Sequence, residues 1–448
     1  MVRGGGKSRD AATAAYRDIH GEDPPIANGS KPSKSSAPTH DELRDRWMYA
    51  HAEYTYGMAA WWQYEGGIHQ SVDELEVKQG ISEVVEAAKV EGVKPTASVI
   101  SSVLELSRIK TFVPAERWDA DPDILVCQNG ALYIPTGELR NHSKEYYATS
   151  AVPYAYDPDA KAPVWEMYLK GTIPEAADFL QEFAGYSVTA DTSLETAVWL
   201  SGPRGSGKST GLMGLQTMLG ARAGILGLAD IERNRFALAN LPGKTLVLAT
   251  EQPASFIRST DVLNAIISGE PIQVERKYKD AYEITPHAKV AWAMNDLPRV
   301  SETTNGIFRR VKVIEFPTIP EEDRDPEVKN LIANEGAGIL NWALEGLARL
   351  RRRGHFNVPE SVRIATREFQ ESNDVVGLFV EEKCIRDPEG REQPSELYKE
   401  YKFWCEEHGH KPVGFANISK EWERLGFESK RSHGKRYWAG VRMRLPHE

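Results

Sequence analysis

The chain has 448 residues, of which 41% are hydrophobic and 27% are charged, and its formal net charge is −10. These values are typical of a globular chain of about three domains, and they exclude a protein that is basic over its whole surface, although a local basic patch can still bind nucleic acid. No apolar run approaches a membrane helix or a signal peptide core, so we expect no membrane partner and a cytoplasmic location. Three scattered cysteines favour a reducing compartment over a disulfide framework.

The N-terminal third is expected to contain an arm and a mainly helical domain. Residues 1–40 are rich in Gly, Pro, Ser and Ala, which predicts a disordered arm, and its GGGKS at 4–8 lacks the preceding strand of a phosphate-binding loop. Residues 41–175 carry apolar side chains at helical spacing, with Asp41 as a plausible first cap. A small β segment is predicted within this domain, where apolar runs are broken by the turn pairs Asn129-Gly130 and Thr136-Gly137.

The remaining residues predict an α/β core followed by two smaller parts. Residues 176–320 alternate helices with the short apolar runs TAVWLSG, KTLVLATE, KVAWAMN and VKVIEF, the pattern of a sheet with buried strands. Residues 321–385 are expected to be a helical extension of this core. Residues 386–448 predict two helices and then a hairpin, a winged-helix-like module with seven basic residues against one acid between Arg424 and Arg444. A basic solvated hairpin without a ligand is the alternative.

The segment GPRGSGKS, residues 202–209, fits the phosphate-binding pattern G-x-x-x-x-G-K-[ST]. An apolar strand leads into it and a predicted helix leads out, which is the context that this loop requires. Gly202 and Gly207 let backbone N–H groups turn toward phosphates, Lys208 reaches the β- and γ-phosphates, and the Ser209 hydroxyl ligates Mg²⁺.

Polar residues at the ends of the later strands are candidates for hydrolysis. Glu251 ends one apolar strand and is the expected metal-binding and water-polarising carboxylate. Asn295 ends the next strand, where an amide can contact the γ-phosphate or the attacking water. Arg309 and Arg310 precede the following strand, and an arginine there fits the arginine-finger role, acting on a neighbouring subunit in a ring.

Two further runs, PIQVER and AYEITP, predict a hairpin between Glu251 and Asn295. Its tip would carry three basic residues around Tyr278, which suits a single-stranded backbone and a stacked base. An ordinary surface hairpin is the equal alternative on composition alone. The basic residues are Arg276, Lys277 and Lys279.

The order of these motifs resembles the superfamily 3 helicases, and it is closest to the phage and plasmid primase–helicase branch shared with poxvirus nucleoside-triphosphatases. Residues 123–169 resemble the domain that precedes the motor in that branch, so the resemblance extends over most of residues 45–385. It implies a P-loop NTPase core of the AAA+-like type, with 41–175 as the pre-motor domain. Many relatives carry a primase domain before the motor, which this chain is too short to hold there.

The resemblance also implies residue roles, a ring and a substrate. The nucleotide-binding residues would be Gly202, Gly205, Ser206, Gly207, Lys208, Ser209 and Thr210. Glu251 would be the Walker B acid, Asn295 sensor 1, Arg310 the likelier finger, and Lys277 the DNA-tracking residue. The implied protein is an ATP- and Mg²⁺-dependent helicase of a mobile element, hexameric and moving 3′ to 5′ on single-stranded or forked DNA, with a separate primase or polymerase as a possible partner.

One departure and two alternatives remain. Asn264 stands where this family often has a lysine, so the role of that lysine is absent or moved. An ATP-switched origin-binding or loading protein would suit the basic C-terminal module and the missing primase. A P-loop kinase or an ATPase unconnected with nucleic acid is the other alternative, against which the basic hairpin argues.

Overall fold

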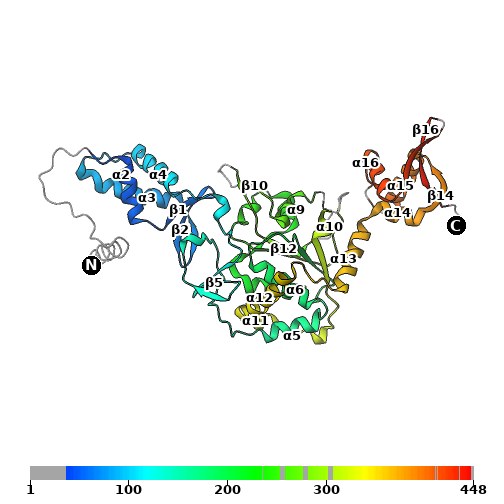
Figure 1. Cartoon of the computed structure of the whole chain (residues 1–448), viewed down its shortest axis with the longest axis horizontal. Helices are drawn as coiled ribbons and strands as arrows, with labels where there is room; N and C mark the ends of the chain where they lie inside the picture. The colour runs from blue at the N-terminus through cyan, green and yellow to red at the C-terminus, as the bar shows by residue number, and fades with distance from the viewer. Residues whose placement is uncertain are drawn as a thin grey trace. The chain divides into compact units, whose positions relative to one another are not determined.

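The computed structural model describes residues 37–234, 236–252, 257, 259–275, 281–300, 306–408, 410, 412–432 and 434–444. The GGGKS segment and the tip of the predicted hairpin, residues 276–280, lie outside the described residues. The chain divides into two compact units, which are shown in Figure 1. One contains the described residues up to His51 together with Leu75–Ser107, and the other contains Ala52–Glu74 and the chain from Arg108.

The first unit is helical, as the sequence predicts. Its helices are α2 (His40–Ala50), α3 (Glu74–Ala87) and α4 (Ala97–Thr111). The prediction of Asp41 as the N-cap of the first helix was wrong, because the N-cap of α2 is Thr39. The N–H of Glu42 donates to the Thr39 hydroxyl at 3.3 Å, and the N–H of Thr39 donates to the Glu42 carboxylate at 2.8 Å. This reciprocal capping box satisfies two backbone donors that a cap at Asp41 would leave unpaired.

Two small antiparallel sheets precede the core. The sequence did not predict the first, formed by β1 (Tyr54–Gly57), β2 (Ala60–Glu65) and β3 (Ile68–Val72). Its strands are rich in aromatic residues, which favour sheets, and the Gly66-Gly67 turn between β2 and β3 has positive φ at both glycines. The second sheet confirms the predicted β segment and contains β4 (Ile124–Cys127), β5 (Gly130–Tyr133) and β6 (Glu138–Arg140).

The core is a five-stranded parallel sheet, an arrangement that fits an α/β NTPase-like fold. Its strands lie in the order β13-β7-β12-β9-β8. The four predicted strands are confirmed, and the short edge strand β8 was not predicted. The bounds are β7 (Ala197–Ser201), β8 (Ala223–Ile225), β9 (Leu246–Gln252), β12 (Lys289–Met294) and β13 (Val311–Glu315).

Helices cover both faces of this sheet because successive strand residues point to opposite sides. Val198 and Leu200 of β7 lie in one buried cluster, whereas Ala197 and Trp199 lie in the other. The first cluster contains α5 (Pro163–Thr172), α6 (Ala177–Val188), α7 (Lys208–Leu219), α11 (Val328–Ile332) and α12 (Gly336–Arg353). The second contains α8 (Leu228–Arg233), α9 (Asp261–Ser268), α10 (Gly306–Arg310) and α13 (Glu360–Asn373).

The C-terminal segment has its own buried cluster around Phe379, Tyr401, Trp404 and Trp422. The two predicted helices and the hairpin are present, and Cys405 is buried among them. A strand before the helices, β14, was not predicted, and it pairs with β16 to complete an antiparallel sheet of order β14-β16-β15. The elements are α14 (Val375–Lys383), β14 (Cys384–Glu392), α15 (Pro394–Glu407), α16 (Phe415–Arg424), β15 (Glu428–Ser432) and β16 (Lys435–Met443).

Within the described ranges, no helix combines the length and the apolar character needed to span a membrane.

Candidate nucleotide-binding site

The glycine-rich loop, residues 202–207, joins the end of β7 to the start of α7. Its glycines have φ of 149° at Gly202, 76° at Gly205 and 95° at Gly207, values that other residues rarely adopt. A Cβ on Gly202 would lie 2.3 Å from the carbonyl oxygen of Phe316. The loop conformation and its close packing on the end of β13 therefore require glycine at these positions.

The loop presents unpaired backbone donors at the start of α7. Among the described residues, the N–H groups of Gly205, Ser206 and Gly207 have no hydrogen-bond acceptor. These donors lie where the helix dipole places partial positive charge. The arrangement suits a bound anion, and the side chains of Ser209 and Thr210 lie in the first turn of the same helix.

The Lys208 ammonium lies inside this loop. It donates to the carbonyl oxygens of Gly202 at 2.6 Å and Pro203 at 2.7 Å, and to the Ser206 hydroxyl at 3.2 Å. It also donates to Oδ1 of Asn295 at 3.3 Å, which brings together two predicted site residues that are 87 positions apart in the sequence. Burial lowers the pKa of Lys208. Its carbonyl partners are neutral, so the positive charge is available to an anion in the loop.

The strand register brings the predicted strand-end residues to one edge of the sheet. The ends of β7 and β12 pair at Ser201 and Met294, and the ends of β12 and β9 pair at Met294 and Gln252. Asn295 and the backbone of Glu251 therefore lie at the same edge as the glycine-rich loop. The Glu251 side chain is outside what the structure describes, so its metal-binding role stays a prediction.

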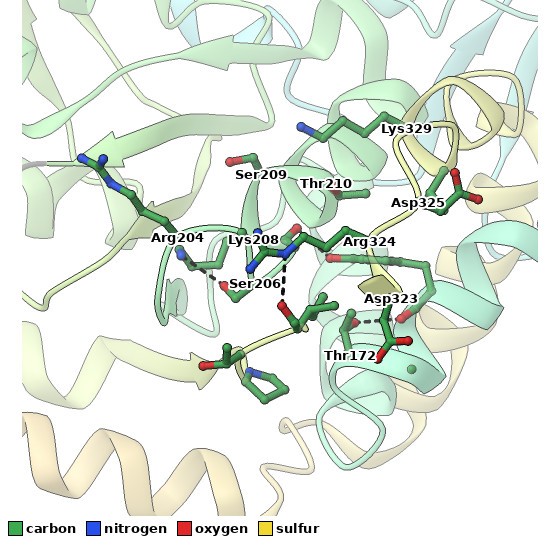
Figure 2. Close-up of a pocket in the computed structure, with 18 of the residues that line it drawn as sticks. Thr172, Arg204, Ser206, Lys208, Ser209, Thr210, Asp323, Arg324, Asp325 and Lys329 are labelled. Atoms are coloured by element: carbon green, nitrogen blue, oxygen red, sulfur yellow. Dashed lines mark hydrogen bonds between the residues drawn. The ribbon is translucent and has the colours of Figure 1, made fainter. Parts of the chain in front are cut away.

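A pocket of about 890 Å³ opens beside the loop. Residues Gly205 to Thr210 and Asn295 form one side of it, and α5 together with residues 317–329 forms the rest. Figure 2 shows Lys208, Ser209 and Thr210 facing the segment that carries Arg324, Asp325 and Lys329. The sequence analysis did not identify this segment as part of the site. The segment directly follows β13, which pairs with β7, and this position is the signal that could have revealed it.

Tyr168 of α5 is a further side chain that sequence reasoning missed. Its hydroxyl donates to the carbonyl oxygen of Gly207 at 2.9 Å, and burial raises its pKa, so it remains a donor at neutral pH. The start of α5 is fixed by Glu335, whose two carboxylate oxygens accept from the N–H groups of Val164 at 3.0 Å and Trp165 at 2.8 Å. A capped helix thus supports the end of the loop where α7 begins.

Three more basic side chains line the pocket besides Lys208. The Arg324 guanidinium lies against the loop, because a Cβ on Gly205 would be 2.7 Å from its Cζ, and its Nε donates to Ile319 at 3.0 Å. In the described part of the chain, neither Arg204, Arg324 nor Lys329 has a carboxylate within 4.0 Å. Asp323 and Asp325 also line the pocket, yet within the described residues neither forms an ion pair with Arg204, Arg324 or Lys329. The pocket therefore has cations available for a polyanionic ligand.

The arginine pair lies at the opposite edge of the sheet. Val311, the residue after Arg310, pairs with Ala197 at the start of β7, whereas the glycine-rich loop follows the end of this five-residue strand. The separation along the strand is about 16 Å at the usual rise. The structure therefore brings together the loop, Lys208 and Asn295, but not Arg310, which cannot contact the pocket of the same chain.

The predicted hairpin is present as two paired strands, β10 (Ile272–Val274) and β11 (Tyr282–Ile284). Its basic residues Arg276, Lys277 and Lys279 lie outside the described residues, so their DNA-binding role remains a prediction. Asn264 lies in α9, where its side-chain amide donates to the Thr260 hydroxyl at 3.0 Å.

The parallel sheet with a glycine-rich loop at its carboxyl edge defines an α/β NTPase-like class of fold. Two family models match the chain. Residues 40–174 match the family described as D5 N terminal like, and residues 200–310 match a family of unknown function, DUF5906.

Solved structures of the NrS-1 C-terminal region are similar to this chain. The A form apo structure of that region has a TM-score of 0.50 and 13% identity, over 89% of this chain and 97% of that chain. Another apo structure of the region has a TM-score of 0.48 and 13% identity, with the same shares covered. At this identity the likeness shows the fold alone. Neither this likeness nor the D5-type match distinguishes the superfamily 3 branch.

Proposed function

We propose that this protein is an ATP-hydrolysing DNA helicase of a phage, plasmid or integrated element. The observation that carries the proposal is the loop geometry, in which Lys208 and Asn295 meet beside unpaired N–H groups at the start of α7. That arrangement suits a nucleoside triphosphate, and the D5-type match, together with a motif order that resembles the primase–helicase branch, supports a role in DNA replication. The finer assignment to superfamily 3, with a Walker A loop at 202–209, is part of this proposal.

The residues have separate tasks in the proposed reaction. Backbone N–H groups of the loop and the Lys208 ammonium hold the β- and γ-phosphates, and Arg324 adds positive charge on the open side. The Ser209 hydroxyl and the Glu251 carboxylate would hold Mg²⁺, which neutralises charge that develops on the phosphates. Glu251 would also polarise the attacking water, and the Asn295 amide would orient that water or the γ-phosphate.

The position of the arginine pair supports the proposal of a closed ring. Hydrolysis is accelerated by a guanidinium on the transferring phosphoryl group, and the pair lies about 16 Å from its own loop. If an arginine of this pair serves a pocket, that pocket belongs to a neighbouring subunit. Repetition of that contact gives a head-to-tail ring, which we take to be a hexamer around single-stranded DNA.

The energy of hydrolysis would move the β10–β11 hairpin along DNA, with Lys277 on the strand and Arg276 and Lys279 beside it. The C-terminal segment, which we interpret as a winged-helix module, would contact a duplex through exposed basic residues of β15 and β16. A separate primase or polymerase would act with it.

The test is ATP hydrolysis with Mg²⁺, with and without single-stranded DNA, for the wild type and Lys208→Ala. We expect hydrolysis that DNA stimulates and that the variant loses. Hydrolysis that ignores DNA would favour a P-loop kinase or another ATPase. Slow turnover with tight, sequence-specific duplex binding would favour an ATP-switched loading protein, and no hydrolysis under any condition would refute the proposal.

A further inference from the structure

The two arginines before β13 share one carboxylate. The same oxygen of Glu195, Oε2, lies 2.8 Å from Nη2 of Arg310 and 3.2 Å from Nη2 of Arg309. One negative charge thus faces two positive charges, so the group of three keeps a net positive charge.

The two arginine side chains differ in burial and in the number of contacts that hold them. The Arg310 side chain is only 8% exposed, and besides Glu195 its Nε donates to the Ser268 hydroxyl at 2.9 Å and its Nη1 to the Gly306 carbonyl oxygen at 3.0 Å. The Arg309 side chain is 64% exposed. Arg310 is therefore fixed inside the subunit, and Arg309 is the guanidinium that can extend beyond it.

The backbone of Glu195 adopts an unfavourable conformation. Its φ is +39°, in the left-handed region that glycine and asparagine adopt far more readily than glutamate. Its N–H donates to the carbonyl oxygen of Thr192 at 3.0 Å, which closes a tight turn just before β7. A turn alone would favour glycine or asparagine here, so the unfavourable residue points to a role for its carboxylate.

We propose that Glu195 is a positioning residue, which, together with buried Arg310, orients Arg309 toward the nucleotide pocket of a neighbouring subunit. Arg309, rather than Arg310, is then the catalytic arginine. This inference rests on the proposed ATP hydrolysis in a ring, and it adds the identity of the arginine and of the group that orients it. In the neighbour, the γ-phosphate competes with Glu195 for the Arg309 guanidinium.

The experiment compares ATP hydrolysis of the full chain with single-stranded DNA present, for the wild type, Arg309→Ala, Glu195→Asn, Glu195→Gln and Asp178→Asn. Asparagine suits the left-handed turn but removes the carboxylate, so it separates charge from backbone strain. Glutamine keeps an oxygen that can accept from either arginine. Asp178→Asn is the matched control, because it removes an exposed carboxylate that faces another arginine, with 3.9 Å between Asp178 and Arg349.

We expect Arg309→Ala to lower kcat about a thousandfold with little change in KM. Glu195→Asn should lower kcat about ten- to a hundredfold at unchanged KM, because it misplaces the arginine. Glu195→Gln should retain more activity than Glu195→Asn, and the double variant Glu195→Asn/Arg309→Ala should be no slower than Arg309→Ala alone. Asp178→Asn should behave as the wild type.

A mixing experiment tests action across the interface. Arg309→Ala subunits keep Lys208, and Lys208→Ala subunits keep Arg309, so an equal mixture contains intact sites. If sites act independently in a randomly mixed ring, about a quarter of the wild-type rate should return. Wild-type kcat in Arg309→Ala or in Glu195→Asn, or no recovery on mixing, would overturn the inference. If the wild type itself hydrolyses no ATP, the proposed function fails instead, before any variant is compared.

Discussion

Lys208 and Tyr168 both contact carbonyl oxygens of the glycine-rich loop, Lys208 at its start and Tyr168 at its end. Only the first of these residues could be identified from the sequence. The sequence pattern predicted Lys208 because its position within the loop is fixed. Tyr168 comes from α5 and reaches the Gly207 carbonyl oxygen across 39 positions in the sequence, a contact that no local pattern encodes. The sequence places Arg310 before its strand, but its burial could not be predicted, because that burial involves contacts with Ser268 and Glu195, which are distant in the sequence.

Replacement of Tyr168 by Phe should weaken nucleotide binding. The change removes the hydroxyl donor to the Gly207 carbonyl oxygen, which lies next to the unpaired donors of the loop. The expected loss is about 1 kcal/mol, or roughly fivefold in Kd. Titration with a fluorescent ATP analogue measures it, with Tyr398→Phe in the C-terminal segment as the control. Equal Kd values for the wild type and Tyr168→Phe would show that the tyrosine does not shape the loop.

As pH rises, nucleotide affinity should begin to fall at a lower pH than it would if the pKa of Lys208 were that of a solvated lysine. Burial lowers the pKa of Lys208, so its ammonium loses the proton at a lower pH than a solvated lysine. A neutral amine attracts phosphate less, so Kd should rise as pH passes upward through the lowered pKa. Lys208→Arg retains its charge throughout, so its Kd should vary less over the same range. A flat profile for the wild type contradicts this account.

At the scale of elements, the strand and helix patterns predicted most of the core. The four apolar runs are strands because they are buried on both faces, and that pattern is visible in sequence. The β1–β3 sheet was missed because its aromatic residues followed a helical stretch without a proline break. Residues 317–329 were missed because a segment with little apolar content shows its role only when β13 is seen beside β7.

The packing of α6 against α12 requires glycine at Gly185. A Cβ there would lie 2.3 Å from the carbonyl oxygen of Ala343 and 2.7 Å from the Cβ of Leu347. Gly185→Ala should therefore lower the free energy of unfolding by about 1–3 kcal/mol, because two backbones must separate. Urea denaturation followed by circular dichroism measures this change.

The matched control is Gly171→Ala in α5, where an added Cβ meets no atom within 4 Å. Alanine has the higher helix propensity, so this variant should be as stable as the wild type or up to about 1 kcal/mol more stable. A Gly185→Ala protein as stable as the control would mean that α6 and α12 pack less closely than described.

At the scale of the whole molecule, different functional groups lie at the two edges of the parallel sheet. The carboxyl edge of the sheet carries the nucleotide pocket, and the opposite edge carries the arginine pair. The order of the motifs predicted which strands these residues follow or precede. The sequence could not predict that the arginines lie beyond reach of their own loop, because the distance depends on the register of β13 against β7.

Exposed lysines and arginines of β15 should contribute to duplex binding if the C-terminal segment is a winged-helix module. Lys430→Glu/Arg431→Glu should weaken binding of the full chain to duplex DNA and reduce the salt dependence of its Kd. Lys420→Glu, an exposed change on α16, is the control. Fluorescence anisotropy at several salt concentrations measures both, and unchanged duplex affinity in the double variant would assign the basic hairpin to solvent or to another partner.

The central claim is that nucleotide hydrolysis at the glycine-rich loop drives strand separation. The direct measurement is release of a labelled strand from a forked duplex with ATP and Mg²⁺, for the wild type beside Lys208→Ala. The account predicts displacement by the wild type and none by the variant, with a free 3′ tail required for loading. Hydrolysis without displacement on any fork would contradict the claim, and would leave the protein as an ATP-dependent switch rather than a motor.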